Sequence, residues 1–560
     1  MAPDPAPDVA AARFGFNRPM DPQTDWRRQD HLDRLDGDFD LIVIGGGIVG
    51  AGVALDATHR GKRVAIIDRG DWAGGTSSRS TKLLHGGVRY LPQMRFGLIR
   101  GGLREQRVLG VIADYLVQSI DFVIPIYRNH GFADAPKWAR HPRVFPVVIR
   151  LGLWWYDRLG VHAKDAKRLL TREELQDRFP RLKMEGLRHG VVYRDAQTDD
   201  ARLTLMVIRT AVDLGAVALN HAEAVDIENS GSDWTVTVRP RFGHATHDLR
   251  APSVVAATGA EHPPGDLADQ LPVMLSKGVH LIVEVDDVGV RDTALVLPET
   301  SDGRVLFLVP WQNHVVIGTT DTPYDGDLTH PTADPADIRY LCDEMGTYLD
   351  VGEVEPISAW AGLRALVDKA GGTTAEASRE HQVVEVAPGY VRVAGGKLTG
   401  YRTIAQNVVD RLYGRRTRSR QGTATVQIHG AGMTDDLVRR VAASLDSLGA
   451  PQHLGSDIVA RYGTAADAML DLAHHDLALA TVIADHWLAA EVVYGVRHEC
   501  VGTISDFVQR RTRIAWFTKD HARSALPEVG RIMAPELGWN KDRLELELEQ
   551  AEQDLAAEGL

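Results

Sequence analysis

Gly45-Gly-Gly47-Ile-Val-Gly50, which follows the apolar run Phe39-Asp-Leu-Ile-Val-Ile44, decides the fold of this 560-residue chain. A short apolar run of this kind is typical of a buried parallel strand. The spacing after it predicts a helix from Ile48 to about His59, with Gly61 placed to cap its C-terminus. Arg63-Val-Ala-Ile-Ile67 then has the pattern of a second parallel strand. These segments together predict one complete βαβ unit.

The glycines match the pattern G-x-G-x-x-G in the strand-to-helix context that a dinucleotide site requires. Gly45 permits a tight turn, Gly47 lets the backbone approach a pyrophosphate, and Gly50 lets helix and strand pack closely. Asp68 ends the second strand, 18 residues after Gly50, where a carboxylate accepts hydrogen bonds from ribose hydroxyls. The pattern predicts a Rossmann-type unit without separating NAD from FAD. Glycines that serve only as turns are the alternative.

The next segment, Gly75-Thr-Ser-Ser-Arg-Ser-Thr-Lys-Leu-Leu-His-Gly-Gly87, favours FAD. Its small hydroxyls and glycines suit a loop that wraps phosphates and brings backbone close to a flat ring. Composition alone leaves a plain Ser/Gly loop equally open.

Bulk properties exclude several classes of protein. The formal net charge of −13 gives no indication of nucleic-acid binding. The two cysteines, Cys342 and Cys500, lie far apart, which is typical of a reducing compartment and excludes a disulfide framework or a zinc ribbon. We predict no metal site. The N-terminus lacks the features of a secretory signal, and no apolar run reaches the roughly 20 residues that span a bilayer.

Later segments differ in pattern from the first unit. Val279–Val285 has a strand pattern, and Val305–Val309 with His314–Ile317 predicts an antiparallel hairpin. From about Ala424 the pattern becomes helical, and seven acids near the C-terminus are expected to form a solvated helical face. We expect a flexible extension at 1–37, a discontinuous nucleotide-binding domain from 38–90, 195–270 and 355–422, a substrate and membrane-facing domain from 91–194 and 271–354, and a helical domain at 423–560.

Several motifs, taken together, give the chain a family resemblance between about residues 40 and 520. They are Thr76-Ser-Ser with Lys82-Leu-Leu-His-Gly-Gly-Val-Arg-Tyr90, Asp199-Asp-Ala-Arg-Leu203, Ala257-Thr-Gly259, Gly318-Thr-Thr-Asp321, Gly395-Gly-Lys-Leu-Thr399 with Tyr401-Arg402, and Phe507-Val-Gln-Arg-Arg-Thr-Arg-Ile-Ala515. In this set the chain resembles the FAD-dependent glycerol-3-phosphate dehydrogenases of the quinone-linked, aerobic type.

The resemblance implies a Rossmann-type FAD-binding domain, an antiparallel-sheet substrate domain in a D-amino-acid-oxidase-like arrangement, and a C-terminal all-α domain. It implies oxidation of sn-glycerol 3-phosphate to dihydroxyacetone phosphate with hydride transfer to FAD. The FAD contacts expected from the fingerprint and the resemblance are Gly45, Gly47, Gly50, Asp68, Thr76, Ser77, Ser78, Thr81, Lys82, Leu83, His85, Gly86, Thr258, Gly259, Gly396, Lys397, Leu398 and Thr399.

The resemblance also assigns the substrate contacts. Arg89, Tyr90, Arg364 and Arg379 are the expected phosphate site, because guanidinium groups bind phosphate bidentately. His280 is the expected general base, and alternation along its strand points it away from the face of Val279 and Leu281. A structural histidine is the alternative. Arg364 and Lys397 complete the expected catalytic set, with Lys397 stabilising negative charge on reduced flavin or substrate.

Two departures from the family pattern leave other functions open. Ala256-Ala-Thr-Gly-Ala-Glu261 stands where N-A-T-G-P-W is usual, and Ala365 replaces a proline after Arg364, in what is expected to be a loop. The alternatives are a glycerol-3-phosphate oxidase that uses oxygen, a non-catalytic FAD-binding scaffold, and an enzyme of the same fold that acts on an amine or amino acid.

Residues 91–170 are basic, with 13 Lys or Arg against six Asp or Glu, a balance of +7. Trp138, Trp154 and Trp155 lie among them, and basic residues beside aromatic ones suit an anionic membrane surface. We expect this segment to place the protein on the cytoplasmic face of the membrane, where electrons pass to a quinone. A basic connector that packs on the acidic remainder is the alternative. A homodimer is expected by analogy.

Overall fold

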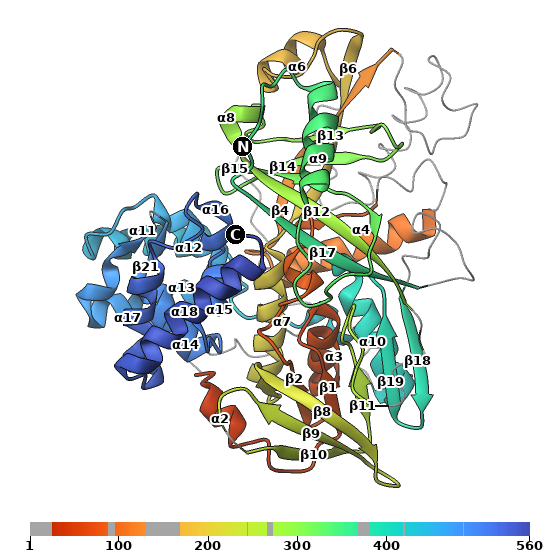
Figure 1. Cartoon of the computed structure of the whole chain (residues 1–560), viewed down its shortest axis with the longest axis vertical. Coiled ribbons are helices and arrows are strands. Elements are labelled where there is room, and N and C mark those ends of the chain that lie inside the picture. Colours follow the sequence, from red (N-terminus) through yellow and green to blue (C-terminus); the bar gives the residue numbers. More distant parts are fainter. Residues whose placement is uncertain are drawn as a thin grey trace, which may run out of the picture.

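The computed structural model describes residues 25–87, 96–128, 169–243, 245–265, 271, 273–367, 381–417, 421–484 and 486–560. Within these ranges the chain forms two sheets that lie end to end and a helical lobe beside them (Figure 1). The basic segment expected at the membrane and the tryptophans in it lie mostly outside the described residues.

The first sheet is the nucleotide-binding sheet, with strand order β18-β19-β11-β1-β2-β7. Its strands are β1 (Leu41–Ile44), β2 (Val64–Ile67), β7 (Val217–Leu219), β11 (Val254–Ala256), β18 (Gln382–Ala387) and β19 (Tyr390–Ala394). All neighbours pair in parallel except β18 with β19. The predicted βαβ unit is confirmed: α3 (Ile48–His59) joins β1 to β2, and Gly61 follows it with a φ of +79°.

Both faces of strands β1, β2, β7 and β11 are buried, which is why these four strands are apolar at every position. Leu41, Val43 and Ile66 pack against α3, α7 (Asp200–Asp213) and α10 (Tyr401–Tyr413). Ile42 and Ile67 pack on the other face against a three-stranded sheet. That sheet consists of β8 (Ala222–Asn229), β9 (Trp234–Pro240) and β10 (His247–Ala251).

The second, larger sheet has strand order β16-β12-β15-β14-β13-β4-β6-β3, with β17 paired to β12 and β5 to β6. Its strands are β3 (Leu83–Leu84), β4 (Gln118–Tyr127), β5 (Leu169–Leu170), β6 (Leu187–Gln197), β12 (Val273–Glu284), β13 (Ala294–Leu297), β14 (Leu306–Trp311), β15 (His314–Gly318), β16 (Thr322–Pro323) and β17 (Ser358–Val367). Pairing is antiparallel except between β13 and β4. The predicted hairpin is present as β14 and β15.

Helices cover this sheet on both faces. α9 (Pro335–Tyr348) begins at Asp334, whose side chain caps the first N–H groups, and it packs through Leu341 and Met345. α4 (Phe96–Ile112) packs on the other face through Ile99 and Leu103. Two short helices, α6 (Arg172–Arg178) and α8 (Val285–Val288), complete this part.

The structure corrects two predicted boundaries. β17 pairs with β12 over ten residues, so 358–367 belong to the large sheet and not with the nucleotide-binding segment 355–422. Residues 25–37 are not part of a flexible extension. Trp26 is fully buried and stacks on Trp72 at 5.9 Å, and α2 (Arg28–Leu32) packs near β7. Aromatic burial over this short stretch outweighs its polar composition.

The helical domain follows from residue 421. Its helices are α11 (Asp435–Ser447), α12 (Leu454–Tyr462), α13 (Ala466–His475), α14 (Ala489–His498), α15 (Ile504–Asp506), a π-helical turn Phe507–Arg511, α16 (Ile514–Phe517), α17 (Leu526–Leu537) and α18 (Lys541–Ala557), beside the short β20 (Val482–Ile483) and β21 (Trp487–Leu488). Among the described helices of the chain, none combines the length and hydrophobicity needed to cross a bilayer. The expected solvated acidic face is wrong at two positions, because Glu547 and Glu558 are buried.

Candidate active site

A cavity of about 2620 Å³ lies where the nucleotide-binding sheet, the large sheet and the helical domain meet. Its walls come from the turn after β1, the loop after β2, the segment 74–87, strand β17 and the loop 395–400. The helical domain contributes Asp506, Arg510 and Glu558. Most of the predicted FAD contacts therefore meet in one place, although they come from distant parts of the sequence.

The glycine turn has the geometry that a pyrophosphate site needs. Gly45 has a φ of +109°, and a Cβ there would lie 2.5 Å from the carbonyl oxygen of Ala257. A Cβ on Gly50 would lie 1.9 Å from the oxygen of Gly45, so helix α3 packs closely only because this residue is glycine. Gly47 lines the cavity at the start of α3. The turn thus fits a dinucleotide phosphate, which approaches bare backbone at a helix N-terminus.

Asp68 lines the cavity beside this turn. Its two carboxylate oxygens accept hydrogen bonds from the N–H groups of Gly46, at 2.6 Å, and Gly70, at 2.8 Å. Burial raises the pKa of Asp68 above its usual value, and these two N–H groups offset part of that rise. The next residue, Arg69, forms an ion pair with Glu261 and donates to Thr329 at 2.9 Å. Asp68 is therefore held in place where the fingerprint predicts a ribose contact.

The segment after this turn forms a second wall of the cavity. Ser77 accepts a hydrogen bond from the N–H of Ile48 at 2.9 Å, and Thr76 donates to the carbonyl of Leu363 at 2.5 Å. The segment is thereby joined to helix α3 on one side and to strand β17 on the other. The further predicted contacts that line the cavity are Thr81, Leu83, His85, Gly86, Thr258, Gly259, Gly396, Lys397, Leu398 and Thr399.

Lys82, Ser78 and Gly50 do not line the cavity, although all three were predicted to contact FAD. The ammonium group of Lys82 is buried and lies 2.8 Å from the carboxylate of Asp200. It also lies 4.9 Å from the ring centre of Trp360. Burial lowers the pKa of Lys82, as does the neighbouring Arg513, and Asp200 offsets part of that effect. The structure thus places Lys82 behind the loop, where its ammonium group pairs with Asp200 instead of lining the cavity.

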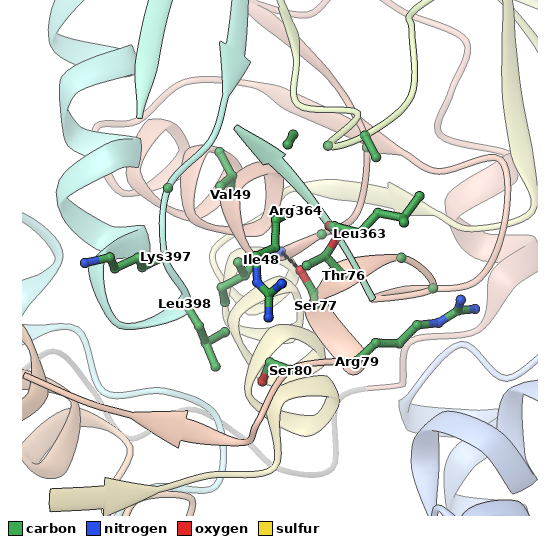
Figure 2. Close-up of a pocket in the computed structure, with 18 of the residues that line it drawn as sticks. Ile48, Val49, Thr76, Ser77, Arg79, Ser80, Leu363, Arg364, Lys397 and Leu398 are labelled. Carbon is green, nitrogen blue, oxygen red and sulfur yellow. Dashed lines mark hydrogen bonds between the residues drawn. The ribbon is translucent and has the colours of Figure 1, made fainter. Parts of the chain in front are cut away.

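Arg364 lies on β17 and faces the cavity (Figure 2). Its guanidinium group donates to the carbonyl of Thr320 at 3.2 Å and to the hydroxyl of Thr319 at 3.0 Å. On the neighbouring strand β12, Arg364 pairs with Ser276, and its side chain reaches Gly278, where a Cβ would lie 2.3 Å from Nη2. The following residue, Ala365, pairs with Leu275 in the sheet, so the expected loop is a strand and its rigidity comes from the ladder.

His280 does not line the cavity; Thr81 lies between it and the cavity. It shares a face of β12 with Ile282, opposite to Val279 and Leu281, as strand alternation predicted. The imidazole is 1% exposed and stacks on Trp360 at 5.6 Å. Nε2 lies 2.8 Å from the hydroxyl of Thr81, which does line the cavity. Burial, and then the charges of Arg364 and Lys82, hold the pKa of His280 well below its usual value, so the imidazole is neutral.

Lys397 lies on a different side of the cavity from Arg79 (Figure 2). It precedes a 3-10 turn, Leu398–Gly400, that leads directly into α10. Lys397 therefore lies at the start of a helical segment. The remaining predicted phosphate contacts, Arg89, Tyr90 and Arg379, lie outside the described residues.

Other residues in the cavity wall or directly behind it were not assigned from the sequence. Arg79 extends toward the helical domain in Figure 2 and forms an ion pair with Glu558 at 2.5 Å. Asp200 joins Lys82, Ser80 and Arg513. Asp200 and Arg513 belong to motifs that the sequence displays, Asp199-Asp-Ala-Arg-Leu203 and Arg510-Arg-Thr-Arg513. Only the fold shows that these two motifs meet.

The comparisons with known proteins agree with this geometry. A family model described as FAD dependent oxidoreductase matches residues 40–404, and one described as the C-terminal domain of alpha-glycerophosphate oxidase matches residues 421–544. The aerobic glycerol-3-phosphate dehydrogenase of Staphylococcus saprophyticus is 31% identical over 92% of this chain and 93% of its own length. Glycerol-3-phosphate dehydrogenase 2 of Mycobacterium tuberculosis is 34% identical, with 98% of this chain and 92% of its own length covered.

The comparison with solved structures gives the same picture. The glycerol-3-phosphate dehydrogenase from Bacillus halodurans, solved in complex with FAD, matches with a TM-score of 0.74 and 27% sequence identity. The match covers 95% of this chain and 97% of that chain. The likeness therefore extends over both sheets and the helical domain.

Proposed function

Because this chain belongs to the family of FAD-dependent oxidoreductases that includes the glycerol-3-phosphate dehydrogenases, we propose that it oxidises sn-glycerol 3-phosphate to dihydroxyacetone phosphate and passes the electrons to a membrane quinone. The observation that carries the proposal is the position of Arg364, a guanidinium group fixed on a rigid strand at the wall of the FAD cavity.

FAD is the cofactor of this family, and the residues present fit it. The bare turn at Gly45 and Gly47 would hold the pyrophosphate, Asp68 would accept hydrogen bonds from the ribose, and the segment from Thr76 to Gly86 would face the flavin. When bound, FAD supplies the acceptor for the hydride that leaves carbon 2 of the substrate. The protein's own contribution is to bind, orient and deprotonate the substrate.

Arg364 binds the substrate phosphate in this proposal. Two of its N–H groups are held by Thr319 and Thr320, and its Nη1 lies 3.6 Å from the carboxylate of Asp321. These contacts fix the plane of the guanidinium group before substrate arrives, so little side-chain entropy is lost on binding. Arg89, Tyr90 and Arg379 are proposed to complete the phosphate site.

His280 is proposed as the base, with Thr81 between it and the substrate. The neutral imidazole has Nε2 at 2.8 Å from the Thr81 hydroxyl, and the hydroxyl lines the cavity. The substrate hydroxyl gives its proton to Oγ1 of Thr81 while Thr81 gives its own proton to Nε2 of His280. The ring cannot swing into the cavity, since it packs between Trp360 and the backbone of Gly318. Lys397, on another wall, is proposed to stabilise negative charge.

The charge of the surface beside the cavity supports a membrane quinone as the electron acceptor. Helix α4 exposes Arg100, Arg104 and Arg107 on one side, and Gly101 and Arg104 also line the cavity. A basic helix face of this kind suits an anionic membrane surface, and its closeness to the cavity gives a quinone a short route to the flavin. The cytoplasmic face of the membrane and the homodimer stay predictions.

The test compares reductants and acceptors with the purified holoenzyme. The proposal requires rapid flavin reduction by sn-glycerol 3-phosphate, slow reduction by glycerol, which lacks the phosphate, and none by glycine. It further requires that a soluble quinone analogue reoxidises the reduced enzyme faster than oxygen does. Equal reduction by glycerol would overturn the phosphate site, and faster reoxidation by oxygen with release of peroxide would make the protein an oxidase.

A further inference from the structure

The segment Arg510-Arg511-Thr512-Arg513 of the helical domain holds both loops that form the FAD site. We propose that this segment makes the helical domain part of the FAD-binding machinery, so that docking of the domain and binding of FAD are coupled. The coupling rests on two sets of buried contacts, one at the loop that carries Asp68 and one at the segment that carries Thr76 to Lys82.

The first set acts on the loop that follows Asp68. Asp71 is buried, and Arg511 binds it through two parallel bonds, Nη1 to Oδ2 at 2.7 Å and Nη2 to Oδ1 at 2.8 Å. Arg510 donates from Nε to the same carboxylate at 2.5 Å. Paired charge-assisted bonds of this kind are strong and directional. Burial alone would raise the pKa of Asp71, but Arg511 and Arg510 hold it below its usual value, so the carboxylate stays ionised.

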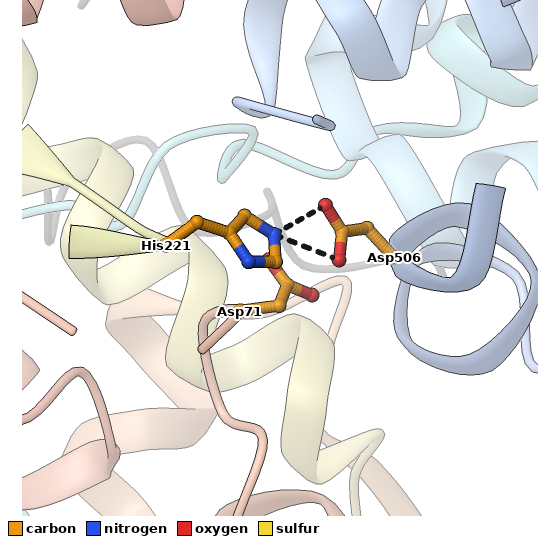
Figure 3. A group of neighbouring side chains, drawn as sticks. All are labelled: Asp71, His221 and Asp506. Carbon is orange, nitrogen blue, oxygen red and sulfur yellow. Dashed lines mark hydrogen bonds and ion pairs between the residues drawn. The ribbon is translucent and has the colours of Figure 1, made fainter. Parts of the chain in front are cut away.

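His221 adds a second connection to the same loop. Its backbone N–H donates to the carbonyl of Gly70 at 2.8 Å, and its Nε2 lies 2.9 Å from Oδ2 of Asp506 (Figure 3). His221, Asp506 and Arg510 all line the cavity. The loop from Asp68 to Asp71 is therefore joined to the helical domain through both its side chains and its backbone.

The group of Asp71, His221 and Asp506 is an ion-pair network and not a metal site. Each carboxylate oxygen of Asp71 already accepts from Arg511, with Asn220 and Arg510 as further donors. Asp506 accepts from the N–H groups of Gly502 and Thr503 as well as from His221. Two guanidinium groups on one side of the cluster would also repel a cation.

The second set acts on the flavin-side segment. Arg513 donates from Nη1 to the carbonyl of Ser78 at 3.0 Å and from Nη2 to Asp200 at 2.6 Å. Asp200 in turn accepts from the N–H of Ser80 at 2.9 Å and from Lys82 at 2.8 Å. Arg513 therefore fixes the backbone of this segment directly at Ser78 and, through Asp200, at Ser80, and Asp200 also holds the side chain of Lys82.

The backbone of the arginine segment is shaped for this double contact. Phe507–Arg511 is a π-helical turn, and Arg513 has a φ of +66°, which a residue with a side chain seldom adopts. The unusual backbone turns neighbouring arginines toward two different loops. Strained conformations persist where the surrounding contacts over-determine them, and they gather at functional sites.

Coupling follows from these contacts by linkage. The contacts exist only when the helical domain is docked, and the loops that they fix are the loops that would hold FAD. Whatever favours docking then favours FAD binding, and FAD favours docking by the same factor. Coupling free energies between sites typically correspond to a 5- to 150-fold change in affinity.

The first experiment measures FAD binding to the apoprotein of Arg511→Gln and of a control, Arg461→Gln. Arg461 is an equally buried arginine of the same domain that pairs with Glu491 at 2.9 Å and contacts neither loop. We expect the FAD dissociation constant to rise roughly 5- to 150-fold in Arg511→Gln and to stay within twofold of wild type in Arg461→Gln. An unchanged constant in Arg511→Gln, or equal losses in both variants, would overturn the proposal.

A second experiment uses the unaltered chain and so does not depend on how the variants fold. Hydrogen–deuterium exchange is compared with and without FAD. Amides of residues 499–513 should be protected by FAD, whereas those of α11, on the far part of the same domain, should exchange at the same rate. Equal exchange of residues 499–513 in both states would show that the domain does not sense the cofactor.

Discussion

Gly278→Ala should strongly impair the enzyme by moving one guanidinium group while the fold stays intact. A Cβ at position 278 would lie 2.3 Å from Nη2 of Arg364 and 2.6 Å from its Cζ and Nη1. Ordinary contact begins at about 3.4 Å, so the guanidinium must move by roughly 1 Å. Because the obstructed atoms are the end of a flexible side chain, the strand itself need not shift, and β12 keeps its pairing with β17.

The expected loss is large because the displaced group is the proposed phosphate ligand. A misplacement of about 1 Å in a binding group can cost about 100-fold in rate. We expect kcat/KM for sn-glycerol 3-phosphate to fall by about that factor, with FAD content and thermal midpoint close to wild type. The assay is steady-state turnover with a quinone analogue, alongside the flavin absorbance of the purified protein.

Gly346→Ala is the matched control, because a Cβ there meets nothing within 4 Å. It lies in α9, and its turnover should equal that of wild type. If Gly278→Ala keeps kcat/KM within twofold while a structure shows the guanidinium displaced, Arg364 does not bind the substrate phosphate and the reasoning fails.

Three further predictions follow from the same site and from the N-terminal segment. Thr81→Val should slow flavin reduction by about 100-fold, because the hydroxyl at 2.8 Å from His280 relays the proton, and Thr81→Ser should keep most of the wild-type rate. A Val variant as fast as wild type in stopped-flow measurements would exclude the relay. Asp68→Asn should raise the FAD dissociation constant about 10-fold or more, because bonds to a charged acceptor are worth roughly 1.5–3 kcal/mol; equal retention of FAD on dialysis would contradict this. His31→Gln should reduce acid sensitivity. Burial, and then Arg34 and Arg209, lower the pKa of His31 to about 3 from 6.5, so the unfolded chain takes up a proton between those pH values that the native chain does not. That part of the stability is complete above pH 6.5 and is lost as pH falls toward 3; the loss at pH 5 amounts to about 2 kcal/mol. Thermal midpoints of both proteins at pH 7 and pH 5 check it, and parallel shifts would refute it.

Local signals predicted the first part of the fold well. The turn from Gly45 to Gly50 needs glycine for steric reasons that act within a few residues, and the strands beside it are apolar because both faces are buried. Pattern and structure therefore agree on β1, α3 and β2, and on the face of β12 that carries His280.

The features that the sequence did not predict depend on contacts between distant segments. Strand β17 belongs to the large sheet because it pairs with β12, about 80 residues earlier along the chain, and no local pattern records that choice. Trp26 orders the N-terminal segment by stacking on Trp72. Lys82 turns from the cavity because its partner, Asp200, comes from another motif, and Glu558 is buried because Arg79 lies opposite.

The most direct measurement is an anaerobic titration of the purified protein with sn-glycerol 3-phosphate, followed by the visible absorption band of the flavin. Bleaching that is complete at about one equivalent of substrate per FAD is the predicted result, because one hydride transfer reduces one flavin. A yellow protein whose band does not change with excess substrate would contradict the proposed reaction while leaving the FAD site in place.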